Sequence, residues 1–151
     1  MKKIYTFIFC FMLAVGAQAQ KNMQRDIQGK WKLVSYQDEQ VYIDAEKGTY
    51  VLDEGFKGML SPDDLKEADH DYKIMTAQYK NATLEFKGDQ AVQIIGTETY
   101  GGTFTLETAG GETVLTISTT EDTEEEAVIT IEKGLLRVTI DDTMDLVYKR
   151  V

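Results

Sequence analysis

The sequence has very few of the residues that build metal, redox and nucleophilic sites. Its 151 residues include one cysteine, one histidine and one proline. A single cysteine excludes a disulfide framework and paired-cysteine redox or zinc motifs, and a single histidine excludes a site with several histidine ligands. With so little proline and no serine-rich stretch there is no sign of a linker, so this length predicts one domain.

Positive charge is also scarce. The chain has 16 Lys and Arg against 26 Asp and Glu, which gives a formal net charge of −10. Nucleic acids and anionic membranes are bound by clustered positive charge, so we expect neither as a main partner. His70 lies between two aspartates, and nothing marks a substrate pocket beside it. We therefore expect a protein that is not an enzyme, with no catalytic residues and no cofactor.

The first 19 residues have the pattern of a secretory signal peptide. Two lysines precede an apolar run at residues 4–15, and residues 17–19 (Ala-Gln-Ala) form a small-x-small cleavage site. The run is about a dozen residues long, whereas about 20 are needed to cross a bilayer as a helix. We expect cleavage after Ala19, export to the periplasm or beyond, and no stable membrane span afterwards. Cleavage would remove Cys10 and leave residues 20–151 as a disulfide-free acidic domain.

From residue 82 onward, apolar and polar residues alternate in short runs, as in half-buried antiparallel strands. Seven such runs are joined by short turns, so sequence neighbours should pair as a meander. With one more strand upstream, the pattern predicts a closed barrel of eight strands, because closure removes exposed sheet edges. The predicted strands are 30–36, 83–86, 91–95, 103–106, 113–119, 127–132, 135–140 and 144–150.

Between the first and second of these strands, the pattern changes to that of a helix. Ser61 suits the N-cap and Pro62 the first helical position. Spacings of three and four then place one set of side chains on a single helical face, which predicts a helix at about 62–80. Residues 37–60 leave two alternatives open, an extra hairpin or an extended loop. The residues on the helical face are Leu65, Ala68, Tyr72, Met75 and Tyr79.

The two ends of the domain resemble those of lipocalin-like proteins. Gly29-Lys30-Trp31 is similar to the Gly-x-Trp motif that opens the first lipocalin strand, and Arg150 lies near the end of the last. In that family an arginine packs over the tryptophan, which implies that Trp31 and Arg150 form a barrel-closing cation–π pair. The whole chain most resembles small secreted bacterial lipocalin-like proteins of the calycin superfamily.

The expected fold class is therefore all-β. It is an eight-stranded antiparallel up-and-down lipocalin-like barrel over residues 20–151, with one α-helix inserted between strands 1 and 2. The stretch around Trp31 is also similar to the start of cellular fatty-acid-binding proteins, which hold a carboxylate with an Arg-x-Tyr motif. The matching positions here are Leu146 and Tyr148. The guanidinium is missing, so carboxylate binding of that kind is not predicted.

The expected function is binding of a small, largely apolar molecule in or at the mouth of the barrel. An eight-stranded barrel can hold one small ligand or be filled by its own side chains. The sequence leaves both alternatives for the interior. The alternative function is a protein-interaction or inhibitor module that uses a filled barrel as a scaffold. The sequence does not indicate an oligomeric state. The candidate ligand-binding residues are Trp31, Tyr72, Met75, Tyr79, Phe86 and Phe104.

The densest acidic run, residues 121–126, raises the question of calcium. Calcium prefers several carboxylate oxygens, but in calcium-binding loops these recur with an alternating spacing that ends in glycine. This run lacks that spacing. We expect a solvated hairpin loop and no metal site.

Overall fold

The computed structural model describes residues 22–119 and 123–151. The predicted signal peptide and its cleavage site lie outside the described residues, as do residues 121 and 122 of the acidic run. None of the helices in the described part of the chain combines the length and the apolar character that a bilayer crossing requires.

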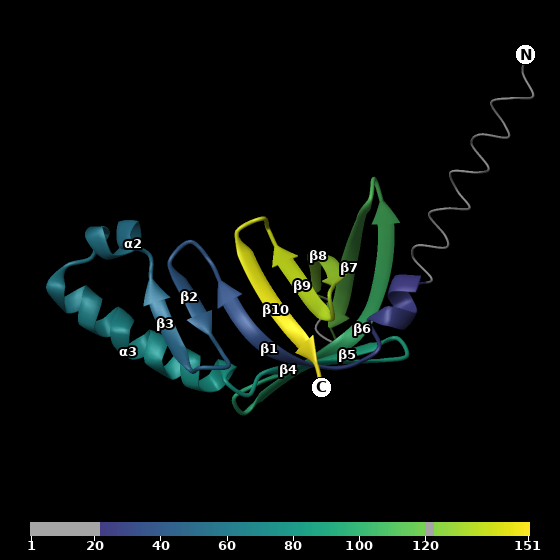
Figure 1. The fold of residues 1–151 in the computed structure, drawn as a ribbon, viewed down its shortest axis with the longest axis horizontal. Coiled ribbons are helices and arrows are strands. Elements are labelled where there is room, and N and C mark those ends of the chain that lie inside the picture. Colours follow the sequence, from purple (N-terminus) through teal and green to yellow (C-terminus); the bar gives the residue numbers. More distant parts are fainter. Residues whose placement is uncertain (1–21, 120–122) are drawn as a thin grey trace, which may run out of the picture.

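The described strands all belong to one antiparallel sheet. They are β1 (Gly29–Gln37), β2 (Val41–Asp44), β3 (Thr49–Leu52), β4 (Thr83–Lys87), β5 (Gln90–Ile95), β6 (Glu98–Ala109), β7 (Glu112–Thr119), β8 (Glu124–Glu132), β9 (Leu135–Ile140) and β10 (Met144–Arg150). Their order is β10-β9-β8-β7-β6-β5-β4-β1-β2-β3, and β10 pairs in addition with β1 (Figure 1). This pairing closes β1 and β4–β10 into an antiparallel barrel, so the predicted eight-stranded barrel is confirmed.

The barrel follows from the alternation of side chains along each strand. Successive residues point to opposite faces, and one alternate set is apolar and buried inside. Trp31, Phe86 and Tyr148 are among the largest fully buried side chains. Each large apolar side chain buried in this way stabilises the fold by about 1.5–3 kcal/mol. The main core therefore lies inside the barrel.

The barrel is closed at the end where β1 begins. Residues 22–26 form a short helical segment there, and the Ile27 that follows is fully buried. The indole Nε1 of Trp31 donates a hydrogen bond to the Ile27 carbonyl oxygen at 2.7 Å. The guanidinium of Arg150 lies 4.4 Å from the centroid of the Trp31 ring and donates to the Gln28 carbonyl oxygen at 2.6 Å. Trp31 and Arg150 are also direct partners in the β1–β10 ladder.

One edge of β1 pairs with β10, and its other edge pairs with two strands in turn. Its first half pairs with β4 up to Lys32, and its second half pairs with β2 from Ser35 onward. The β1–β10 register shifts between Leu33 and Ser35, which is the same place. Residues 37–60 therefore contain the hairpin β2–β3, followed by a short helix α2 (Glu54–Met59). Of the two alternatives for this segment, the extra hairpin is the one present.

Helix α3 (Pro62–Tyr79) occupies the predicted helical segment. It begins with a capping box, in which the Ser61 hydroxyl accepts from the Asp64 amide and the Asp64 carboxylate accepts from the Ser61 amide. Helices α2 and α3 lie with β2 and β3 to one side of the barrel (Figure 1).

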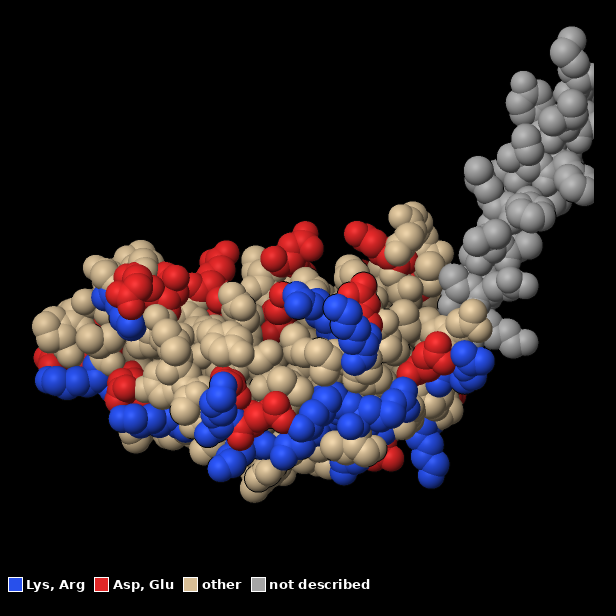
Figure 2. All heavy atoms as spheres, in the orientation of Figure 1, with Lys and Arg blue, Asp and Glu red and all other residues tan. Residues whose placement is uncertain are grey.

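Charge is unevenly placed on the face shown in Figure 2. Acidic side chains gather along one edge, over the β1–β2 and β9–β10 turns, and Lys and Arg gather along the opposite edge. The two turns contain Asp38 and Glu39, and Asp141 and Asp142, respectively. On this face, acidic side chains are therefore concentrated along one edge.

Candidate functional site

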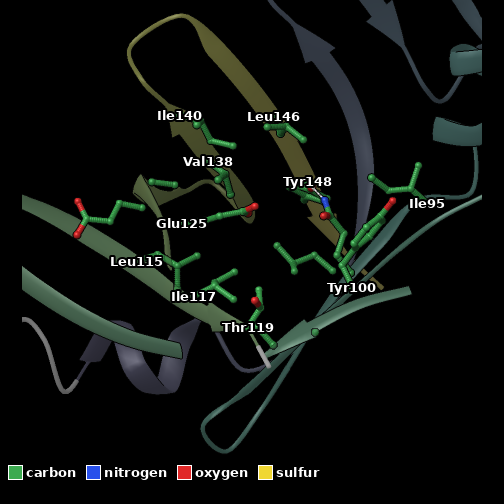
Figure 3. A pocket seen from close by; sticks show the side chains of 16 residues that line it. Ile95, Tyr100, Leu115, Ile117, Thr119, Glu125, Val138, Ile140, Leu146 and Tyr148 are labelled. Atoms are coloured by element: carbon green, nitrogen blue, oxygen red, sulfur yellow. Dashed lines mark hydrogen bonds between the residues drawn. The ribbon is translucent and has the colours of Figure 1, made fainter. Parts of the chain in front are cut away.

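A cavity of about 310 Å³ lies inside the barrel, away from its closed end. Its wall includes the end of β5, the start of β6, the end of β7, the start of β8 and the end of β9. Topologically these positions lie opposite the end that Trp31 and Arg150 close. Tyr100 and Glu125 line the cavity and are also exposed, so it opens to solvent here (Figure 3).

The wall of the cavity is mainly apolar. An apolar cavity of about 150 Å³ can hold one benzene molecule, so this one has room for a somewhat larger ligand. Its volume is at the lower end of the range of about 300–1,000 Å³ typical of ligand sites. The barrel is thus packed at one end and hollow at the other. The apolar lining residues are Leu84, Ala91, Ile95, Leu115, Ile117, Ala127, Val138, Ile140 and Leu146.

A tyrosine–glutamine pair supplies polar groups within this wall. The Gln93 side-chain amide donates a hydrogen bond to the Tyr148 hydroxyl at 3.1 Å. Burial, only partly offset by this bond, raises the pKa of Tyr148 well above its ordinary value. The phenol therefore stays neutral at physiological pH. Closer to the opening, the hydroxyls of Thr119 and Thr123 are 2.6 Å apart.

Glu125 brings a carboxylate to the cavity. It is the ladder partner of the lining residue Ile117, which places it on the inner face of β8, and Figure 3 shows its side chain directed into the pocket. Glu126 also borders the cavity, but it is the partner of Thr116 on the outer face. Among the described residues, those that line the cavity include no lysine, arginine or histidine.

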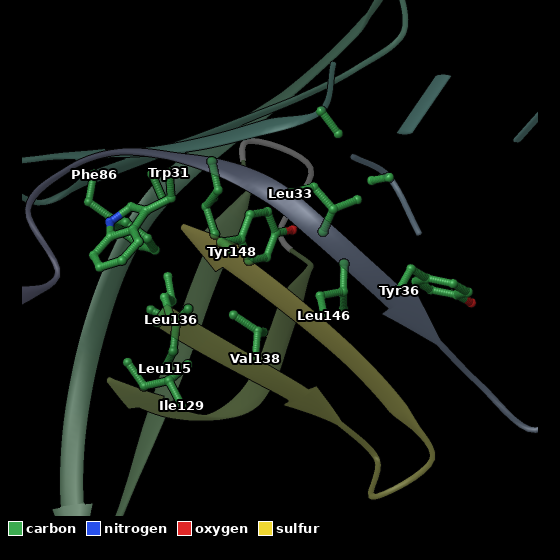
Figure 4. Packing of buried hydrophobic residues seen from close by; sticks show 14 of the residues in the cluster. Trp31, Leu33, Tyr36, Phe86, Leu115, Ile129, Leu136, Val138, Leu146 and Tyr148 are labelled. Carbon is green, nitrogen blue, oxygen red and sulfur yellow. The ribbon is translucent and has the colours of Figure 1, made fainter. Parts of the chain in front are cut away.

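Three of the predicted ligand-binding residues lie in the core and not at the cavity. Trp31, Phe86 and Phe104 are all buried, and the two phenylalanine rings meet edge to face with centroids 5.0 Å apart. Figure 4 shows Trp31 and Phe86 together at one end of the packed cluster, with Val138 and Leu146 further along it. These aromatic side chains fill the closed end of the barrel.

The other three predicted ligand-binding residues lie on α3, and they do not line the cavity either. Tyr72, Met75 and Tyr79 pack against the core cluster as partly buried side chains. The ring centroids of Tyr72 and Tyr50 (on β3) are 6.0 Å apart, and those of Tyr79 and Tyr36 (on β1) are 5.2 Å apart. Their shared face therefore attaches the helix to the sheet.

The sequence pattern does not indicate the residues that shape the cavity, because several of them are small. Ala91 on β5 and Ala127 on β8 are small residues of the wall and leave the space unfilled. Small residues at inward positions of several barrel strands were the available signal. Glu125 also follows this alternation, but in the sequence it belongs to the acidic run at residues 121–126.

The described residues contain no group of three or more His, Cys, Asp or Glu side chains placed to hold a metal ion. Of the acidic run, residues 121 and 122 lie outside the described part, and Glu124–Glu126 belong to β8.

No family model matches the chain, and no curated protein matches its sequence. Among solved structures, it is similar to that of a DUF4847 family protein from Bacteroides vulgatus ATCC 8482. The sequence identity is 11% and the TM-score is 0.48, over 85% of this chain and 96% of the other. A similarity of this size concerns the fold alone.

Proposed function

We propose that this protein is an exported, lipocalin-like binding protein that takes a small, largely apolar molecule into the barrel cavity. The observation that carries the proposal is a cavity of about 310 Å³ with a mainly apolar wall, inside a barrel that is otherwise packed. Protein interiors are normally close-packed, and atoms that face an empty space lose dispersion contacts. A ligand of matching size would restore those contacts and remove its own apolar surface from water.

The lipocalin-like assignment rests on the resemblance at the two ends of the barrel. The Gly-x-Trp motif opens β1, and the arginine at the end of β10 packs over its tryptophan. Export rests on the composition of residues 1–19 alone. A hollow end favours a carrier over a protein-interaction module whose barrel is filled, and the proposal is of a binding protein, not of an enzyme.

Filling the cavity from its wall tests the proposal. Ala127 lines the cavity, and its neighbour Val128 belongs to the outer face of β8. We expect the neutral fluorescent probe N-phenyl-1-naphthylamine to bind the purified protein saturably. Ala127→Phe should weaken binding at least about tenfold, a change of about 1.4 kcal/mol, whereas Val128→Phe should bind like the unaltered protein.

Circular dichroism and Trp31 fluorescence would establish that both variants are folded. The absence of a saturable signal with the unaltered protein would refute the proposal. So would equal binding by the two phenylalanine variants, because the probe would then occupy another surface.

A further inference from the structure

We infer that the ligand of this cavity is an amphiphile with a cationic amine, whose ammonium group pairs with Glu125 while its apolar body occupies the barrel. This inference rests on the proposed function and adds to it the chemical class of the ligand. The argument combines the position of Glu125, the charges that surround it, and the polar and aromatic groups near the opening.

Glu125 is placed where the head group of a bound amphiphile would lie. Its ladder partner Ile117 and the next inward residue along β8, Ala127, both line the cavity. Its carboxylate is therefore next to an apolar wall on one side and open to solvent on the other. A ligand whose apolar part enters the barrel would leave its polar end beside this carboxylate (Figure 3).

The Glu125 carboxylate has no protein counterion in the described part of the chain. None of the ion pairs among the described residues includes it. The lining residues contribute two glutamates and no lysine, arginine or histidine from the described ranges. A bound carboxylate or phosphate would meet like charge without a compensating cation, whereas an ammonium group would supply the missing partner.

The other groups near the opening suit a cation as well. Tyr100 lines the same cavity and is exposed at the opening, and the negative face of a tyrosine ring attracts cations. Thr119, also in the wall, brings a hydroxyl oxygen that can accept a hydrogen bond from an ammonium group. The formal net charge of −10 further favours the approach of cations at low ionic strength.

Three probes that share one apolar chain test the inference. They are n-octylamine, 1-octanol and sodium octanoate, titrated calorimetrically into the purified protein at pH 7 and low ionic strength. We expect n-octylamine to bind about fivefold more tightly than 1-octanol, because a partly exposed ion pair contributes at most about this factor. Sodium octanoate should bind more weakly than 1-octanol, and added salt should reduce the preference for the amine.

The matched variants are Glu125→Gln and Glu124→Gln. Each removes one negative charge from the start of β8, but Glu124 pairs with Ser118 on the outer face and does not line the cavity. Glu125→Gln should bring n-octylamine close to the affinity of 1-octanol. Glu124→Gln should keep the preference of the unaltered protein, which controls for the change in net charge.

The outcomes separate this inference from the proposed function. If 1-octanol binds but n-octylamine binds no more tightly, or if sodium octanoate binds best, the inference is wrong and the cavity still takes apolar molecules. If the amine preference survives Glu125→Gln, the assignment to Glu125 is wrong. If none of the three probes binds, both the inference and the proposed function are wrong.

Discussion

Arg150, the last residue of β10, lies with its guanidinium carbon 4.4 Å from the centroid of the Trp31 ring near the start of β1. The same guanidinium donates hydrogen bonds to the carbonyl oxygens of Asp26 and Gln28. The Arg150 side chain thus joins the end of β10 to the segment that precedes β1. Because this end is packed, the space for a ligand lies at the other.

Removing this guanidinium should weaken the closed end. We expect Arg150→Ala to lower the free energy of unfolding by about 1–2 kcal/mol, through loss of a cation–π contact and of hydrogen bonds from a charged donor. Arg150→Lys should recover only part of this, because an ammonium group lacks the planar fork of the guanidinium. Urea titration followed by the fluorescence of Trp31, the sole tryptophan, measures both. Equal stability of Arg150→Ala and the unaltered protein would contradict the expectation.

Gly102 is expected to tolerate no side chain. A Cβ atom there would lie 2.2 Å from the carbonyl oxygen of Ser118 on β7, a backbone atom that cannot move aside alone. Gly102→Ala should therefore destabilise the protein by about 1–3 kcal/mol through overpacking. Gly58 in α2 has nothing within 4 Å of its Cβ position, so Gly58→Ala should be neutral or stabilise by up to about 1 kcal/mol. Thermal denaturation of the two variants provides the comparison.

Thr76 on α3 is a site where a substitution should stabilise the fold. It is 4% exposed, and its hydroxyl has no hydrogen-bond partner among the described residues. Thr76→Val keeps the shape and removes the unsatisfied polar atom, so we expect a gain of about 1 kcal/mol. Thr76→Ser keeps the hydroxyl and removes a methyl group, and it should lower stability by a similar amount. Chemical denaturation should rank the valine variant above the unaltered protein and the serine variant below it.

The contact between Tyr50 and Asp69 should appear in the alkaline pH dependence of stability. Burial, followed by the hydrogen bond from its hydroxyl to Asp69, raises the pKa of Tyr50 from 10.0 to about 12. Between these pH values the folded protein keeps a proton that the unfolded chain releases. The contribution is therefore complete below pH 10 and is lost as the pH rises towards 12.

Tyr50→Phe should accordingly make the unfolding free energy fall less steeply between pH 10 and pH 12. Denaturant titrations at several alkaline pH values measure the slope. An unchanged slope in Tyr50→Phe would mean that the pKa of Tyr50 is not raised in the folded protein.

The barrel strands were predictable because each shows its inner face as a local alternation of apolar and polar residues. For residues 37–60 the sequence indicates two alternatives, an extra hairpin or an extended loop, because the hairpin β2–β3 is short and its place depends on a remote partner. Val41–Asp44 pairs with β1 only after β4 has diverged from it. The place where β1 changes partner from β4 to β2 is set by the tertiary fold, and residues 37–60 carry no periodic signal of it.

The candidate site is harder to predict, because the alternation points to large inward residues as its lining. Phe86 and Phe104 are inward and aromatic, but such side chains fill an interior and leave no space. The helical face of Tyr72 and Tyr79 was correctly read as apolar, but a sequence pattern does not say which of two apolar surfaces it meets. The cavity instead depends on where small residues on different strands, such as Ala91 and Ala127, come together.

The pairing of β1 with β10 means that the first and last strands of the barrel are neighbours. During synthesis, β1 (Gly29–Gln37) is made well before its partner β10 (Met144–Arg150). Until then the sheet has two bare edges, which are surfaces prone to aggregation. The barrel can therefore close only once β10 has been made, and a copy of the protein that lacks β10 would keep both edges bare and become a substrate for chaperones and proteases.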